Sequence, residues 1–280
     1  MRILSIQSSV AYGHVGNSAA VFPLQRLGHE VWPVNTVHFS NHTGYGVWRG
    51  PLLSPLDVAS VIAGVAERGV LPSCDAVLSG YQGDAEMGAV ILDAVSKVKA
   101  ANPLAIYCCD PVMGDVDRGF FVRPGIPEFM RDSVVPAADL VTPNHFELDF
   151  LTGRTTTSLP EVLSAIADLQ ALGPSHVLVT SALPHDGAMD VIAASPEGIW
   201  AVTTPQLPFT PSGCGDLTAA LFLAHLSTDG SPATALAATT SSVYAVLEQT
   251  LLLGSREIAL VAAQSYIADP PMNFLVRQLG

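Results

Sequence analysis

PSGCGDLTAALFLAHL (residues 211–226) combines an apolar helical pattern with a glycine-rich turn directly before it. The helical period of apolar residues begins at Leu217, and Gly213, Gly215 and Asp216 precede it. The first turn of a helix has unpaired N–H groups and a partial positive charge. Glycines leave these N–H groups open to a bound anion. The stretch therefore predicts a helix N-terminus that holds an anionic group.

The aspartate in this stretch has three interpretations. A carboxylate beside an anion can accept a proton from a hydroxyl group that attacks a phosphorus held there. Asp216 could instead cap the helix after a glycine-rich turn. The stretch could also be part of a dinucleotide-binding fingerprint, but Thr218 stands where that pattern needs its third glycine. A Walker A sequence, with Gly-Lys-Ser/Thr, does not occur in the chain.

Outward from this stretch, strand and helix patterns alternate along the chain. The expected strands are 2–8, 30–39, 75–80, 104–110, 139–143, 176–181, 188–194 and 198–207. The expected helices are 17–27, 55–68, 85–101, a helix from Pro124, 144–151, 159–172 and everything from Gly213 to the end, with polar loops at 40–50 and 111–123.

This alternation predicts an α/β fold with a doubly wound, mostly parallel sheet and helices on both faces. The two late strands, 188–194 and 198–207, predict antiparallel strands at one edge. Neither a linker nor an internal repeat interrupts the pattern, so a single domain is expected over residues 1–280.

Composition excludes several classes of partner. The net charge is −13 and no basic stripe occurs, which argues against nucleic acid. Lys97 and Lys99 are the only lysines, so a metal, arginines or backbone N–H groups must hold an anionic ligand. The 4 cysteines lack C-x-x-C spacing, which indicates a reducing compartment. The N-terminus does not resemble a signal peptide, and the longest uncharged run contains serines and threonines, so a cytoplasmic protein without membrane association is expected.

Polar residues follow five of the predicted strands. They are Ser8–Ser9, Asn41–Thr43, Gly80–Gln82, Asp110 and Asn144–Glu147. Ligands of doubly wound sheets bind beyond the carboxyl ends of the strands. These residues therefore predict a binding rim at one edge of the sheet layer.

Six separated motifs carry a resemblance to a known family. They are QSSVAYGHVGNSAA (7–20), WPVNTVHFSNHTGYG (32–46), DAVLSGYQGD (75–84), CDPVMGD (109–115), TPNHFEL (142–148) and SGCGD (212–216). With these motifs in this order, the chain resembles the pyridoxal kinases of the ribokinase-like superfamily, in particular the bacterial pyridoxamine/pyridoxal kinase branch. The resemblance runs from Ile3 to the C-terminal helices.

The resemblance implies a catalytic role for the SGCGD motif. Asp216 would be the base that takes the proton from the 5′-hydroxyl of pyridoxal, pyridoxamine or pyridoxine as it attacks the γ-phosphorus of ATP. The backbone N–H groups of Gly213, Cys214 and Gly215 would form the anion hole. The expected product from pyridoxal is pyridoxal 5′-phosphate, made in vitamin B6 salvage.

The family's acidic pair corresponds to Asp110 and Glu147. The resemblance implies that they hold Mg²⁺ through water, since Mg²⁺ gives up its hydration shell reluctantly. Alternatively, Asp110 could cap a turn before Pro111 and Glu147 could be a solvated helix charge. Their shared position on the predicted rim favours the functional interpretation. A monovalent cation such as K⁺ is a further candidate cofactor, and a homodimer is the family's expected assembly.

The vitamer side is assigned by the same resemblance. Ser8 would hydrogen-bond the pyridine nitrogen, His42, Thr43 and Gly44 would face the ring substituents, and Tyr81 would pack on the ring. The alternatives are a strand-end hydroxyl for Ser8, polar loop surface for His42 and a core side chain for Tyr81.

The expected contacts with ATP are Thr142, Thr180, Pro205, Gln206, Leu207 and Pro208, together with Asp110 and Glu147. The segment before SGCGD looks shorter than in many relatives, so the assignment of 205–208 depends on few residues. At Thr180 bacterial relatives commonly have a lysine, and threonine does not supply that charge to ATP. Arg118 is a candidate substitute cation, whereas His14 is expected to support its loop.

Other functions compete with this prediction. A hydroxymethylpyrimidine kinase is the close rival, and a non-catalytic protein that binds B6 vitamers is an alternative from a different class. A carrier needs no base, so Asp216 argues against it, whereas Thr180 is in its favour. A nicotinamide-dependent oxidoreductase lacks its glycine fingerprint. The loops 40–50 and 111–123 are candidates to close over the site and exclude water.

Overall fold

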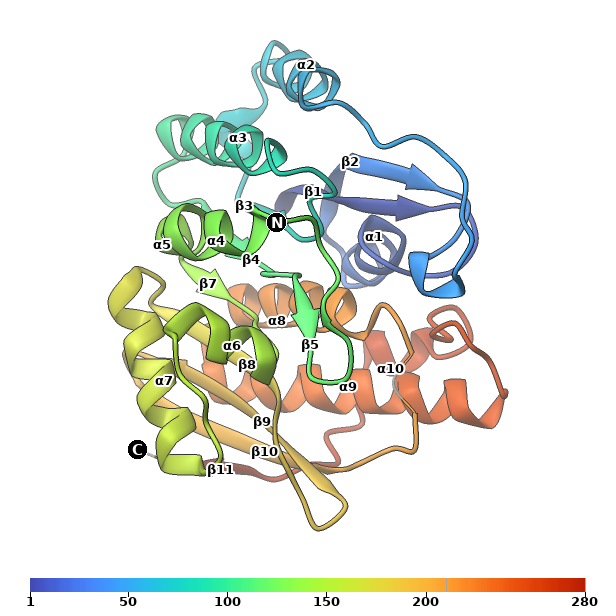
Figure 1. The fold of residues 1–280 in the computed structure, drawn as a ribbon, viewed down its shortest axis with the longest axis vertical. Helices are drawn as coiled ribbons and strands as arrows, with labels where there is room; N and C mark the ends of the chain where they lie inside the picture. The colour runs from blue at the N-terminus through green and yellow to red at the C-terminus, as the bar shows by residue number, and fades with distance from the viewer. Residues whose placement is uncertain (210, 280) are drawn as a thin grey trace.

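The computed structural model describes residues 1–209 and 211–279, and Asp229 by its backbone alone. Within these residues, nine strands form one sheet in the order β2-β1-β3-β4-β7-β8-β9-β10-β11 (Figure 1). The strands are β1 (Arg2–Val10), β2 (Glu30–Phe39), β3 (Ala76–Ser79), β4 (Ile106–Cys109), β7 (Leu140–Val141), β8 (His176–His185), β9 (Ala188–Ser195), β10 (Gly198–Pro205) and β11 (Val276–Gln278).

The pairing of the strands confirms the predicted sheet. The strands from β2 to β8 pair in parallel, and β8, β9, β10 and β11 pair antiparallel. The antiparallel strands therefore lie at one edge, as the late hairpin in the sequence indicated. β8 is longer than the predicted strand 176–181, because its second half pairs with β9 through irregular register.

Helices cover both faces of the sheet (Figure 1). They are α1 (Asn17–Arg26), α2 (Pro55–Ala66), α3 (Met87–Ala101), α4 (Ile126–Phe129), α5 (Val135–Ala137), α6 (His145–Thr152), α7 (Leu159–Leu172), α8 (Cys214–Asp229), α9 (Pro232–Leu252) and α10 (Gln264–Ala268). Short turns of other helix types are η1 (Thr43–Tyr45), η2 (Leu71–Ser73) and the π-helical η3 (Met130–Val134). α2 begins at Pro55 as predicted, because the Ser54 side chain accepts a hydrogen bond from Asp57 N–H.

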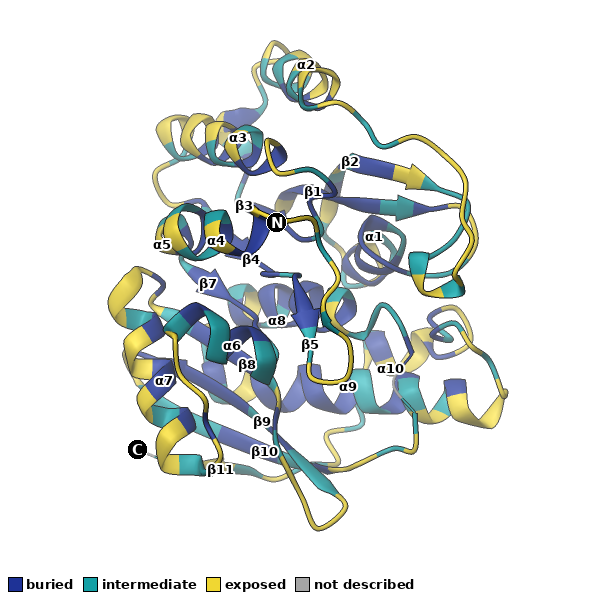
Figure 2. Ribbon diagram, in the orientation of Figure 1, coloured by how far each residue is buried: buried dark blue, intermediate teal, exposed yellow. Residues whose placement is uncertain are grey.

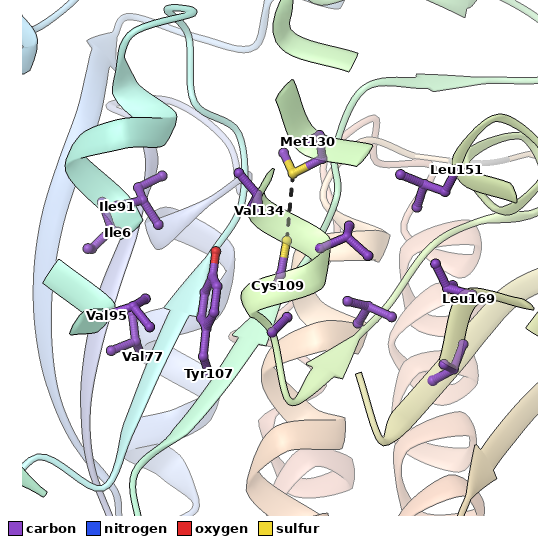
Figure 3. Packing of buried hydrophobic residues seen from close by; sticks show 14 of the residues in the cluster. Ile6, Val77, Ile91, Val95, Tyr107, Cys109, Met130, Val134, Leu151 and Leu169 are labelled. Atoms are coloured by element: carbon purple, nitrogen blue, oxygen red, sulfur yellow. Dashed lines mark hydrogen bonds between the residues drawn. The ribbon is translucent and has the colours of Figure 1, made fainter. Parts of the chain in front are cut away.

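Alternation along β4 shows how one sheet separates two cores. Tyr107 and Cys109 face a cluster built with α3, α6 and α7, whereas Cys108 faces a cluster built with α1, α8 and α9. Figure 2 shows the sheet as the dark, buried layer between the helices, and Figure 3 shows Tyr107 and Cys109 among aliphatic side chains, with Cys109 Sγ 3.7 Å from Met130 Sδ. Each large apolar side chain buried here contributes about 1.5–3 kcal/mol.

Two of the sequence-based predictions about loops and the C-terminus were wrong. The C-terminal region is not helical throughout, because β11 pairs with β10 and turns separate α9 from α10. The loop 111–123 contains a small hairpin, β5 (Gly114–Asp115) and β6 (Gly119–Phe120). None of the helices described is long and apolar enough to span a bilayer.

Candidate active site

The turn before α8 needs glycine at its first position. Gly213 caps the helix with a φ of 93°, and a Cβ there would lie 1.9 Å from the His14 carbonyl oxygen. Only glycine adopts this backbone freely and admits so close a neighbour. The first helical bond runs from Leu217 N–H to Gly213 O, so the N–H groups of residues 214–216 precede the helical ladder. The turn thus has the open N–H groups that an anion hole requires.

Asp216 stands in the first turn of α8 and is partly exposed. The nearby Gly16 N–H lowers the pKa of its carboxyl group, but burial has the larger effect and raises this pKa above the usual range. Gly16, with a φ of 53°, lies tightly on Ser8: a Cβ on Gly16 would be 2.2 Å from Ser8 O and 2.3 Å from Ser8 Oγ. The structure therefore brings Ser8 and Asp216 together around Gly16.

Asp110 follows β4 and is buried at the centre of the rim. Its Oδ1 accepts a hydrogen bond from Thr142 Oγ1 at 3.2 Å, whereas its buried Oδ2 has no hydrogen-bond partner within the described protein. This Oδ2 faces the α8 turn, 3.8 Å from where a Cβ on Gly215 would stand. Burial, and then the charges of Glu147 and Asp216, raise the pKa of Asp110 well above its usual range.

Glu147 is not a solvated helix charge, since it is buried at the start of α6. It forms a capping box with Asn144, whose N–H donates to Oε2 at 3.0 Å. Met113 N–H donates to Oε1 at 2.9 Å, and Gly114 N–H lies 3.4 Å from the same oxygen. Burial raises the pKa of Glu147 to about 7, and the backbone donors oppose this rise. Backbone donors thus occupy both oxygens of Glu147.

A cation site at this rim would depend on Asp110. Among the described residues, no group of three His, Cys, Asp or Glu side chains is arranged to hold a metal. The orphaned Oδ2 of Asp110 nevertheless fits a hydrated cation, because burying a carboxylate oxygen without a partner is costly. Glu147 is a second acidic group near this place, since its charge raises the pKa of Asp110.

His42 connects the loop 40–50 to the turn before α8. Its Nδ1 accepts from Gly44 N–H at 3.1 Å and lies 3.0 Å from Ser212 Oγ. Burial and the nearby Arg118 lower the pKa of His42. A neutral ring that carries its proton on Nε2 satisfies both contacts.

Thr43 and Tyr81 line one cavity of ≈ 260 Å³. The other lining residues are Phe39, Trp48, Gly50, Leu52, Gly83 and Arg123. Thr36 Oγ1 donates to the Tyr81 carbonyl at 2.8 Å, which fixes the backbone behind the ring, and burial raises the Tyr81 pKa. Ser8 lies outside this cavity, beside Gly16.

The residues expected to contact ATP divide into two groups. Thr142 and Thr180 lie at the rim, since Thr142 bonds Asp110 and Thr180 N–H donates to the Pro143 carbonyl at 2.9 Å. Pro205 ends β10 and Gln206, Leu207 and Pro208 follow it, where Gln206 N–H donates to Gly187 O at 2.8 Å. Their described contact is with the β8–β9 hairpin, so their contact with ATP stays a prediction.

Two further side chains are already engaged. Arg118 pairs with Asp115 at 2.8 Å and stacks 4.9 Å above the Phe121 ring. Its Nη1 lies 3.9 Å from where a Cβ on Gly44 would stand, so Arg118 faces the loop 40–50. Cys214 donates from Sγ to Pro211 O at 3.0 Å, and burial raises its pKa to about 12, so it is a thiol rather than a nucleophilic thiolate.

Sequence reasoning missed the segment between α9 and α10. Glu257 accepts hydrogen bonds from Tyr45 OH at 2.6 Å and from His14 N–H at 3.0 Å. The Arg256 guanidinium lies 3.8 Å from the centre of the Tyr45 ring. No local pattern marks these charges, because their partners are more than two hundred positions away in the chain.

A mostly parallel sheet whose rim meets a glycine turn and aspartate at the start of a helix defines the class of ribokinase-like kinases. The sequence pattern of the phosphomethylpyrimidine kinase family matches residues 67–260. The chain is 61% identical to the pyridoxal kinase PdxY of Rubrobacter xylanophilus over 284 residues, covering 100% of this chain and 98% of that protein. It is 56% identical to the PdxY of Leifsonia xyli, with 100% of both chains covered. The chain belongs to the pyridoxal kinase family.

Solved structures agree with this family. The pyridoxal kinase of Leishmania donovani in complex with ADP and pyridoxamine matches with a TM-score of 0.93 at 26% identity, over 100% of this chain and 99% of that one. The same enzyme with ADP and pyridoxine matches with a TM-score of 0.92 at 27% identity, over the same shares of both chains. The fold class predicted from the sequence is thereby confirmed.

Proposed function

We propose that this chain transfers the γ-phosphoryl group of ATP to the 5′-hydroxyl of pyridoxal, and of pyridoxamine or pyridoxine, in vitamin B6 salvage. The observation that carries the proposal is the pair formed by the open N-terminus of α8 and the Asp216 carboxylate beside it. Binding alone would not need a carboxylate at an anion site. The high identity to pyridoxal kinases supports the choice of acceptor.

In the proposed reaction, the 5′-oxygen attacks the γ-phosphorus and a new O–P bond forms. The bond from that phosphorus to the β-phosphate oxygen breaks, and ADP leaves. Asp216 accepts the hydroxyl proton, and the N–H groups of Gly213, Cys214 and Gly215 bind the transferred phosphoryl oxygens. The raised pKa of Asp216 suits a base that must hold a proton briefly and release it.

Ser8, His42, Thr43, Gly44 and Tyr81 are proposed to hold the vitamer. Ser8 is beside Asp216 through Gly16, and Thr43 and Tyr81 share a cavity. A ring held between these two places would direct its 5′-hydroxyl toward Asp216. Holding the reacting atoms in this orientation would accelerate the transfer, because the two groups no longer have to find each other.

Mg²⁺ is the proposed metal, with Asp110 Oδ2 as its nearest carboxylate and Glu147 as second acidic neighbour. When bound, the metal neutralises the charge of the ATP phosphates. Thr142 orients Asp110 through its hydrogen bond to Oδ1, and leaves Oδ2 for the cation. K⁺ is proposed as a further cation. Activity should then be higher in K⁺ than in the same concentration of tetramethylammonium.

The proposal also includes a single domain over residues 1–280, a homodimer and a cytoplasmic location. The pairing of β11 with β10 supports the single domain, because it joins the end of the chain to the common sheet. Cooperative unfolding in one transition would test the single domain, and sedimentation would test the dimer.

The test of the function is ATP-dependent formation of pyridoxal 5′-phosphate by the purified protein with Mg²⁺. Asp216→Asn keeps the shape of the side chain and removes the base, so kcat should fall about a thousandfold. An equal rate for both proteins would remove Asp216 from the mechanism. Tight binding of pyridoxal without any ATP consumption would instead identify a carrier.

Phosphorylation of hydroxymethylpyrimidine is the second candidate function, favoured by the family pattern over residues 67–260. Turnover of both acceptors under one set of conditions separates the two. The proposed function requires a higher kcat/KM for pyridoxal than for hydroxymethylpyrimidine.

A further inference from the structure

The segment Ser255–Ile258 lies between α9 and α10 and touches two loops from the beginning of the chain. Glu257 Oε2 accepts from His14 N–H, and Glu257 Oε1 accepts from Tyr45 OH. Arg256 Nη2 donates to Gly44 O at 2.9 Å and its guanidinium covers the Tyr45 ring. One short segment therefore holds both the loop 11–16 and the loop 40–50.

The contact with the loop 11–16 continues to the catalytic turn. The Glu257 carboxylate lies against Gly13, where a Cβ would be only 2.2 Å from Oε2. On the other side of the same loop, the His14 carbonyl contacts Gly213. Gly16, two residues after His14, has its N–H near the Asp216 carboxylate and lowers its pKa. The loop is thus fixed between Glu257 and the turn that carries Asp216.

A second route runs through the loop 40–50. Tyr45 is held by Glu257 on its hydroxyl and by Arg256 on its ring, and the hydrogen bond to Glu257 raises the Tyr45 pKa to about 12. Within three residues of Tyr45, the His42 ring contacts Ser212 of the turn. Glu257 is the residue at which both routes meet.

We propose that Glu257 is a positioning residue that ties the docking of the loop 40–50, through Tyr45, to the placement of Asp216, through His14. This inference rests on the proposed kinase function. Through Tyr45, Glu257 keeps the loop over the vitamer. Through His14, it sets where Gly16 N–H and the α8 turn stand, and therefore where the base meets the 5′-hydroxyl.

The two routes predict different kinetic effects for two variants. Tyr45→Phe removes only the hydroxyl, so the KM for pyridoxal should rise about fivefold while kcat stays within about twofold of the wild type. Glu257→Gln replaces one of the two acceptor oxygens with an N–H₂ donor, so Tyr45 OH and His14 N–H can no longer both donate to this side chain. It should raise that KM similarly and also lower kcat about tenfold, because small displacements of a catalytic group are costly.

The experiment measures kcat and the KM for pyridoxal in wild type, Tyr45→Phe, Glu257→Gln and the double variant. Glu248→Gln, an exposed carboxylate on α9, is the matched control and should behave like the wild type. The effects of Tyr45→Phe and Glu257→Gln should not add in the double variant, because both substitutions act on the hydrogen bond between residues 45 and 257. Thermal unfolding of each variant tests whether it is folded under the conditions of the kinetic assay.

Unchanged kcat in Glu257→Gln, or additive effects in the double variant, would overturn the inference while leaving the kinase function intact. A wild-type protein that forms no pyridoxal 5′-phosphate would overturn the proposed function, and the inference with it. If Glu257→Gln does not fold, Tyr45→Phe still decides: a wild-type KM for pyridoxal in that variant would contradict the proposal.

Discussion

The end of β4 and the start of α6 each bring one carboxyl group to the same rim, but the protein treats the two differently. Asp110 and Glu147 are equally buried, each with 4% exposure. Backbone N–H groups occupy both oxygens of Glu147, whereas one oxygen of Asp110 has no partner in the described protein. Equal burial therefore conceals different roles: Glu147 holds the loop after β4 and the cap of α6, and Asp110 is left available to a ligand.

The largest expected effect is a loss of catalytic rate in the variant Asp110→Asn. The amide keeps the acceptor for Thr142 and removes the charge that a cation would meet. Phosphoryl transfer should fall about 100-fold, since the charge acts on developing charge in a buried site. The free energy of unfolding should stay the same or rise, because an unpaired buried charge disappears. Steady-state kinetics and urea unfolding measure both; a clear loss of stability would make Asp110 structural like Glu147.

Glu147→Gln should have its main effect on stability. The amide places N–H₂ against backbone N–H donors, so the free energy of unfolding should fall by about 1–3 kcal/mol. Glu161→Gln is a matched control, because Glu161 forms the same capping box on α7 but is exposed, and its loss should be much smaller. If Glu147→Gln unfolds like the wild type but loses all activity, the two carboxyl groups act alike and the contrast fails.

The smallest expected effect is a pH dependence of stability in the absence of ATP and metal. Burial raises the pKa of Glu147 from 4.5 to about 7 in the folded state and raises that of Asp110 as well. The folded protein then binds more protons than the unfolded chain, so this contribution is complete below pH 4.5 and is lost as the pH rises through about 7.

Urea unfolding at a series of pH values should therefore show a decline of about 1 kcal/mol per pH unit over this interval. The decline should be shallower in Asp110→Asn, where one of the two coupled groups no longer titrates. A stability that increases steadily from pH 5 to pH 7 would show that both carboxylates are well paired when charged.

Much of the fold follows from periodic patterns that are local in sequence. The strands β1, β2, β3, β4, β7 and β8 alternate with helices, and this pattern and the late hairpin predicted a mostly parallel sheet with antiparallel strands at one edge. β11 was missed because three residues show no period. Its strand form depends on pairing with β10 and on Arg277, whose Nη2 donates to Thr203 Oγ1 at 2.9 Å. A contact of this kind has no trace in the local sequence.

The candidate site divides in the same way. The motifs that predicted Asp110 and Asp216 are short and local, and the sheet topology then brings them to one rim. The sequence did not indicate that backbone donors surround Glu147. Its capping partner Asn144 can be recognised three residues before it, but the donor Met113 is far away in the sequence. Glu257 was not predicted, because a single charged residue forms no recognisable motif. Its contacts with Tyr45 and His14 exist only in the folded chain.

The contact between Gly213 and the His14 carbonyl has a consequence for the making of the protein. A nascent chain that has been synthesised only as far as α7 contains the strands β1, β2, β3, β4 and β7 of the sheet, but it lacks Asp216. The loop 11–16 can contact Gly213 only after the start of α8 has been synthesised, and it can contact Glu257 only later still. Contacts of such sequence separation form late and slowly. A growing chain therefore gains the base and both supports of the loop 11–16 only after residue 257 has been synthesised.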